Sequence, residues 1–239
     1  MIASVHIADV GPLAALGVLR ARPRPRSVEG LRYAEVASAA SLSARLLPIA
    51  SPGRVALIAA WEDDLALDRF LAGHELAAPF AAGWHVRLQP TRIVGRWSEL
   101  PELALPEQAM DEEEPAAVLT LGRLRLRNAL RFLRASAAAE ELALREPALL
   151  AASGLARPPR LVATFSLWRT TRAMHRYARG ASEPSHAAVV RAHAAKPFHH
   201  ESAFVRFRPY GASGSWDGRE PLAGAVASGE RTPVGAGTG

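Results

Sequence analysis

The feature that most constrains the fold is an internal repeat. A β-type run at 54–61, a helical pattern and a second run at 84–88 are matched, in the same order, by runs at 160–168 and 203–207 around another helical pattern. Each half then closes on a proline, a glycine and a tryptophan: Pro90, Gly95 and Trp97, then Pro209, Gly214 and Trp216. The second copy is about twelve residues longer, which predicts an insertion around 181–200.

Each half also opens on a strand-like run, 2–7 and 118–121, followed by a helical stretch and a second extended segment at 30–37 and 149–155. The second helical stretch carries Leu126, Leu130 and Leu133 on one face, with arginines opposite. The order β-α-β-β-α-β, present twice, predicts an α+β protein of two tandem ferredoxin-like repeats whose sheets face each other. We expect repeats at 1–97 and 116–222, an acidic, proline-rich, solvated linker at 98–115 and a disordered tail at 223–239.

Composition removes several classes of protein. Cysteine is absent, so disulfides, cysteine-bound zinc, iron–sulfur clusters and thiolate-bound haem are excluded. The net charge of +6 comes from scattered arginines with one lysine, Lys196, which argues against nucleic-acid binding and leaves a weak attraction to anionic membranes. No apolar run reaches the ~18 residues of a membrane span and no signal peptide is evident, so we expect a cytoplasmic protein with peripheral membrane contact at most.

Four stretches share the pattern of a known family: residues 30–33, 59–61, 164–168 and the closing stretch. The closing stretch is the most specific, and it contains His186, Arg191, Phe198, Glu201, Arg206-Phe207 and 214–222, which reads Gly-Ser-Trp-Asp-Gly-Arg-Glu-Pro-Leu. Over 30–97 and 118–222 the chain resembles the spheroidene monooxygenase family. The resemblance implies a haem b-dependent oxygenase with a dimeric α/β barrel, which uses dioxygen and an electron donor such as ferredoxin to oxidise a hydrophobic, carotenoid-like substrate.

The candidate haem ligand is His186. Five of the eight histidines lie within 174–201, and His186 opens a predicted helix at 185–193 on which it shares an apolar face with Val189, Val190 and His193. His186 combines this face with the matching position in the family, and His193 is the second choice. We therefore expect one haem per chain, in the second half.

A different metal site is a second hypothesis. His199, His200 and Glu201, with His193, could form a two-histidine, one-carboxylate site for non-haem iron or zinc. Adjacent histidines on a strand point to opposite faces, however, so an exposed polar segment entering a strand is the stronger interpretation.

Other candidates lie on the predicted strands. Phe204, Arg206 and Arg208 share one face of the last strand; if that face lines the barrel, Arg206 could hold a haem propionate or polarise bound oxygen, and otherwise these arginines are ordinary edge charges. His6 could be a distal polar group in the same cavity or a satisfied strand histidine. Phe165 and Trp168 are expected in the apolar pocket, although the five tryptophans fit core packing first. Two alternatives to an oxygenase remain: a non-catalytic haem or lipid binder, and a haem dehydratase of the same fold.

Overall fold

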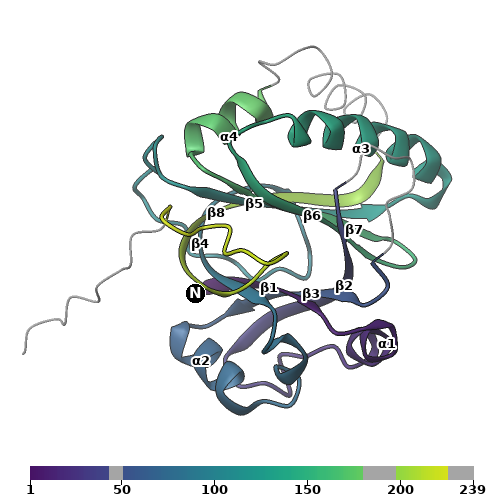
Figure 1. Ribbon diagram of the computed structural model, residues 1–239, viewed down its shortest axis with the longest axis vertical. Coiled ribbons are helices and arrows are strands. Elements are labelled where there is room, and N and C mark those ends of the chain that lie inside the picture. Colours follow the sequence, from purple (N-terminus) through teal and green to yellow (C-terminus); the bar gives the residue numbers. More distant parts are fainter. Residues whose placement is uncertain (43–50, 180–197, 226–239) are drawn as a thin grey trace, which may run out of the picture.

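The computed structural model describes residues 1–42, 51–179 and 198–225, and they form a closed antiparallel barrel (Figure 1). The first half supplies β1 (Ile2–Asp9), α1 (Pro12–Arg20), β2 (Leu31–Ser41), β3 (Arg54–Trp61), α2 (Asp64–Gly73), the short helix η1 (Ala78–Phe80) and β4 (Trp84–Arg96). The second half supplies β5 (Ala116–Leu124), η2 (Leu126–Asn128), α3 (Ala129–Leu144), β6 (Leu149–Arg157), β7 (Leu161–Trp168), α4 (Thr171–Ala178) and β8 (His199–Gly214). Among these helices, none is long and apolar enough to cross a membrane.

The strand order repeats in the two halves. Around the barrel the order is β1-β3-β2-β6-β7-β5-β8-β4, so the first half reads β4-β1-β3-β2 and the second half reads β8-β5-β7-β6. The two halves are joined by antiparallel pairing of β2 with β6 and of β4 with β8. The predicted α+β class and the predicted order of elements are confirmed, and the architecture is consistent with a dimeric α/β barrel within one chain.

The repeated closures take the same backbone conformation. Gly95 and Gly214 both have left-handed φ angles, +87° and +89°, which side-chain-bearing residues rarely adopt. A Cβ atom on Gly95 would overlap the carbonyl oxygen of Ser202 on the neighbouring strand. Two residues beyond each glycine the tryptophan turns into the barrel core. Because β4 and β8 are antiparallel, Trp97 and Trp216 close opposite ends of the barrel.

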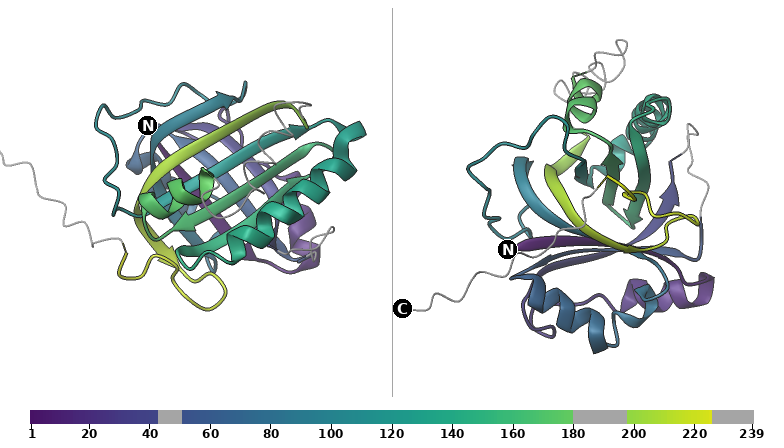
Figure 2. Two further views of the ribbon diagram at one scale, coloured as in Figure 1. Left: turned by 90° about the horizontal axis from the view of Figure 1, so that it is seen from above. Right: turned by 60° about the vertical axis from the view of Figure 1, so that its left-hand side comes forward.

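Two apolar layers stabilise the molecule. The barrel interior is packed by inward-facing side chains of all eight strands, while α1 and α2 cover the outside of the first half and α3 and α4 lie outside the second (Figure 2). All five tryptophans are buried, as their positions predicted: Trp61, Trp84, Trp97, Trp168 and Trp216. The predicted apolar face of α3 is wrong in part, because Leu126 and Leu130 remain 52% and 53% exposed and Phe132 packs on His199 instead.

The segment between the halves contains no helix or strand, but it is not wholly solvated. Leu103 is buried in the barrel core, and Leu222, near the end of the described chain, packs into the same core. The predicted domain limits themselves stay a prediction. The predicted insertion at 181–200 lies largely, and the tail from 226 onward wholly, outside the described residues.

Candidate functional site

The outer faces of the two half-sheets are covered very differently. In the first half, Ser4 and His6 of β1 and Leu57 of β3 are fully buried beneath the helices. At the equivalent second-half positions, Val118 and Thr120 of β5 are only half-buried. Thr164 and Ser166 of β7 are half-buried too.

The facing helix is also accessible. Ala143 is the single buried residue of α3, whereas the shorter α2 buries Ala66, Leu67 and Phe70. Because contacting surfaces bury each other, partial exposure of both faces means that α3 covers its sheet less completely than α2 covers the first half. We call the layer between α3 and the sheet the α3 slot, and define it by the half-buried residues Val118, Thr120, Thr164 and Ser166 on the sheet and Phe132, Ser136 and Ala139 on the helix.

Two arginines lie side by side at the edge of this face. Arg206 of β8 is the direct cross-strand partner of Arg92 of β4, and within the described residues neither guanidinium has a carboxylate at ion-pair distance. Burial lowers the pKa of Arg206, and the charge of Arg92 lowers it further. Burial and then Arg206 also lower the pKa of His175 on α4. Uncompensated like charges on adjacent strands are unfavourable, so this position suits an anionic group.

The face of β8 that carries Arg206 is the outer one. Val205 and Phe207 point into the barrel core, while Phe204, 48% exposed, shares the outer face with Arg206. Of the two interpretations of this face, the one in which it lines the barrel interior is therefore wrong, because Val205 and Phe207 occupy the inward positions of β8. Arg206 and Phe204 instead lie beside the α3 slot, because their partners on β5 are Val118 and Thr120. Arg208 is paired with Glu114.

His6 is also outside the barrel. Its ring is fully buried beneath η1, 5.8 Å from the ring of Phe80 and stacked 5.3 Å from that of His85. Its Nε2 lies 2.8 Å from the Ser4 hydroxyl, which accepts a hydrogen bond from Trp61 Nε1. Burial, with smaller contributions from His85 and Arg87, lowers the pKa of His6 to about 3. The expectation of a distal group in a central cavity is wrong, and the alternative of a packed strand histidine fits.

Phe165 and Trp168 do not share a pocket. Phe165 is buried inside the barrel, where its ring stacks 6.4 Å from that of Trp216. Trp168 points outward beneath α4, lies 5.0 Å from the ring of Tyr177 and donates a hydrogen bond to the Ser166 hydroxyl. Their odd and even positions on β7 place them on opposite faces, so the expected common wall is wrong.

The non-haem alternative is not supported by the geometry. His199 packs between Phe132 of α3 and Gly122 of β5, His200 is exposed, and Glu201 points toward the barrel end. The part of the chain that the structure describes contains no group of three or more histidine and acidic side chains able to hold a metal ion. His186, Val189, Val190 and His193 lie outside the described residues, so the ligand assignment remains a prediction.

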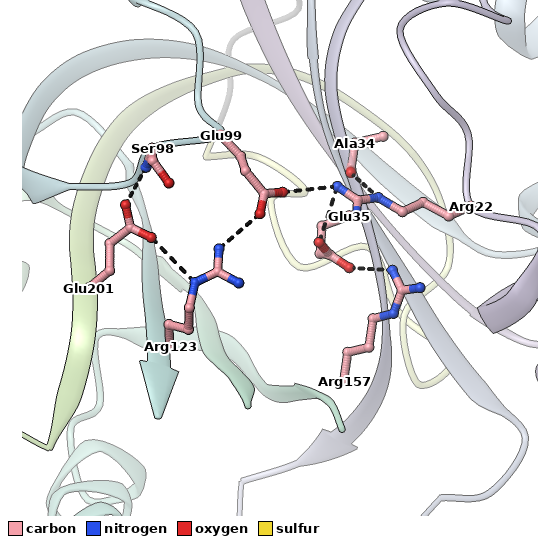
Figure 3. A network of polar contacts seen from close by, with 8 residues as sticks. All are labelled: Arg22, Ala34, Glu35, Ser98, Glu99, Arg123, Arg157 and Glu201. Atoms are coloured by element: carbon pink, nitrogen blue, oxygen red, sulfur yellow. Dashed lines mark hydrogen bonds and ion pairs between the residues drawn. The ribbon is translucent and has the colours of Figure 1, made fainter. Parts of the chain in front are cut away.

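One end of the barrel is closed by alternating charges that sequence reasoning missed (Figure 3). The chain of ion pairs runs Glu201–Arg123–Glu99–Arg22–Glu35–Arg157, with N···O distances of 3.4, 2.9, 3.3, 3.3 and 2.7 Å. Glu201 also accepts from the Ser98 amide, and Arg22 donates to the Ala34 carbonyl. Glu35 is the buried member. Glu35 lies two residues from Tyr33 and two from Ala37 along β2, and both of these side chains point into the barrel core. This spacing is the sequence signal that predicts an inward-pointing Glu35.

We expect Glu35→Gln to lower the free energy of unfolding by about 2 kcal/mol, because it leaves Arg22 and Arg157 without their shared buried carboxylate. Urea unfolding measures the change. Glu29→Gln is the matched control: Glu29 is an exposed carboxylate 3.5 Å from Arg69, and its loss should cost less than ~0.5 kcal/mol. If the two substitutions lower the free energy of unfolding equally, the burial of Glu35 does not increase its contribution to stability.

The opposite end of the barrel has a cavity of about 230 Å³. Its walls come from the end of β2, the start of β6, the end of α3 and the segment after β8, and the lining includes Leu42, Leu144, Leu150, Trp216 and Arg219. Trp216 thus separates this cavity from the packed interior. The cavity meets the sheet face of the second half at Ala152, a half-buried residue of β6.

The strand order and the barrel closed within one chain define the class: α+β barrel proteins built from two similar halves. A solved aldoxime dehydratase has this fold, with a TM-score of 0.54 and 9% identity over 87% of this chain and 80% of that one. No family model matches the sequence.

Sequence similarity is more specific than the fold. Spheroidene monooxygenase of Rubrivivax gelatinosus is 32% identical over 174 residues, 71% of this chain and 65% of that protein. The spheroidene monooxygenase of Cereibacter sphaeroides is 27% identical over 175 residues, 71% of this chain and 53% of that protein. The chain is similar to three spheroidene monooxygenases, which supports its membership in that family. It spans between about half and two thirds of the length of these relatives.

Proposed function

We propose that this protein is a monooxygenase that oxidises a hydrophobic, carotenoid-like substrate with dioxygen, and that haem b binds in the α3 slot. Family membership supports the reaction class. The observation that carries the location is the contrast between equivalent outer positions, which are half-buried at Val118, Thr120 and Thr164 and fully buried at Ser4, His6 and Leu57. We also infer that the barrel is a pair of ferredoxin-like repeats equivalent to a dimeric α/β barrel.

The described residues fit such a group. A haem needs a largely apolar environment, and the slot residues include the apolar Val118 and Phe132 beside the small side chains of Thr120 and Thr164. It also needs cations for its propionates, and Arg206 with Arg92 forms a pair that no carboxylate of the described residues neutralises. His186, in the family-matched position, would supply the imidazole that holds the iron.

When bound, haem supplies the chemistry that activates dioxygen for insertion into a C–H bond. The residues of this chain have other tasks. Phe132 and Val118 exclude water from the slot, and Phe204 offers an apolar surface at its edge. The Arg206 guanidinium holds a negative charge at the outer face of β8, which fixes the orientation of the group.

Titration with haemin tests the cofactor. We expect one haemin per chain, with a Soret absorption band, and we expect His186→Ala to lose the five-coordinate spectrum while His200→Ala keeps it. Thr164→Phe should lower haemin affinity at least ~tenfold by filling the slot, since a strand accepts the aromatic side chain readily. Arg206→Gln should weaken binding less.

The matched control for slot filling is Ser38→Phe, a half-buried serine on the outer face of β2 in the first half, which should leave haemin affinity unchanged. Two haemins per chain, or an unaltered spectrum in His186→Ala, would contradict the assignment, and His193 would then be tested next. Incubation with an acyclic carotenoid, dioxygen and reductant separates the alternatives. An oxygenated product supports a monooxygenase, and haem binding without product supports a carrier.

A further inference from the structure

The start of α3 presents apolar side chains to solvent. Leu126 of η2 and Leu130 of α3 are 52% and 53% exposed, four residues apart and therefore on one side of the helix. Burying such side chains is favourable, so a solvent-exposed pair at a helix start is a candidate contact surface.

Cations from three segments surround these leucines. Arg127 and Arg134 are exposed on the same helix start, Arg160 is exposed in the turn between β6 and β7, and His200 is exposed at the start of β8. Hydrogen bonds hold the segments together: Leu124 donates to the Arg160 carbonyl at 2.8 Å, and Arg125 donates through its backbone and its Nε to the carbonyls of Phe198 and His199 at 2.9 Å. We call Leu126, Leu130, Arg125, Arg127, Arg134, Arg160 and His200 the Leu126 patch.

The patch is not neutralised by neighbouring acids. Between Pro115 and Glu140 the sequence holds five arginines and no acidic residue. Among the described residues, Arg127, Arg134 and Arg160 form no ion pair with a carboxylate. The pKa of His200 is lowered by desolvation and then by Arg125, Arg160 and Arg127, which agrees with a concentrated positive field.

Interleaved leucine and arginine fit the interface of a lipid bilayer. Leucines can enter the boundary between headgroups and acyl chains while arginines bind lipid phosphates, and each contribution strengthens the other. An acidic protein would complement the charge but would leave both leucines to find a separate apolar partner. We propose that the Leu126 patch docks the protein on anionic lipid membranes. Since α3 also forms a wall of the slot, docking here would bring the slot close to the phase in which a hydrophobic substrate dissolves.

Vesicle flotation tests the proposal without haem or substrate, so its outcome is independent of the proposed function. The full chain should float with vesicles of phosphatidylcholine and phosphatidylglycerol in equal parts, and not with phosphatidylcholine alone. Arg127→Glu with Arg160→Glu should lower the bound fraction ~tenfold or more. Leu126→Asp with Leu130→Asp should do the same, and ~0.3 M salt should weaken binding of the unmodified chain.

Leu13→Asp with Arg24→Glu is the matched control, because Leu13 of α1 is 87% exposed and Arg24 is an exposed arginine in the loop that follows α1. This variant should bind as the unmodified chain does, and circular dichroism should show that all variants are folded. Equal binding to neutral vesicles, or equal loss in the control, would overturn the proposal. A dimer in light scattering that the Leu126 variant converts to monomer, without vesicle binding, would assign the patch to a second copy instead.

Discussion

Replacing Gly214 by alanine is expected to lower the free energy of unfolding by about 4 kcal/mol, one of the largest effects of any single methyl group in this chain. At φ +89° an alanine costs about 1–2 kcal/mol in backbone strain alone. In addition, its Cβ would overlap the carbonyl oxygen of Gly83, next to the pairing of Trp84 with Gly214 that joins the two halves. Relief of the overlap would pull β8 away from β4. Urea unfolding, with the midpoint and slope fitted together, measures the loss.

Gly218→Ala is the matched control. Gly218 also has a left-handed φ angle, +79°, but a Cβ there meets nothing within 4 Å. It should therefore show the strain alone, about 1–2 kcal/mol. If the two variants lose the same free energy, the contact between Gly83 and Gly214 is not what limits position 214.

Acid is expected to destabilise the protein through His6. The folded state keeps this buried ring neutral, with a pKa near 3, whereas the unfolded chain takes up a proton at the ordinary pKa of 6.5. Because the unfolded state then binds more protons, stability falls as the pH drops below 6.5. Between pH 6.5 and about 4.5 the loss should reach about 2–3 kcal/mol. Urea midpoints across this range measure it.

His6→Gln isolates the contribution of this ring. The glutamine side chain can still hydrogen-bond to Ser4, but it does not titrate, so the unfolding free energy of the variant should depend less on pH over the same range. His85 and His175 also have lowered pKa values and remain in both proteins. A variant with the same pH slope as the unmodified chain would show that His6 is not the group responsible.

Much of the fold was accessible from local patterns. The predicted run at 54–61 coincides with β3, and the run at 160–168 differs from β7 by one residue. Asp63 follows β3 and accepts a hydrogen bond from the Ala66 amide at the start of α2, as acidic residues before helices commonly do. These features depend on alternation, periodicity and capping, which act over a few residues and are therefore visible in the sequence.

Which face of each strand points into the barrel was harder to predict. The alternation of Val205, Arg206 and Phe207 shows that two faces differ, but not that the arginine points away from the barrel interior. In a strand covered on both sides, both faces are apolar enough to be buried, and β1, with buried residues on both faces, is an example. For this reason the predicted inward orientation was wrong for His6 and for Trp168.

The sequence alone settled the repeat, the order of its elements and the burial of its tryptophans, because these follow from spacing along one chain. The tertiary structure decided which faces turn inward, why the second half has an accessible layer and how the barrel end is closed. Glu35 and Arg157 are 122 residues apart, and Glu99 and Arg22 are 77 apart. No sequence pattern shows that these charges form ion pairs. They come within reach of one another only because β2 pairs with β6 and β4 pairs with β8 when the barrel closes.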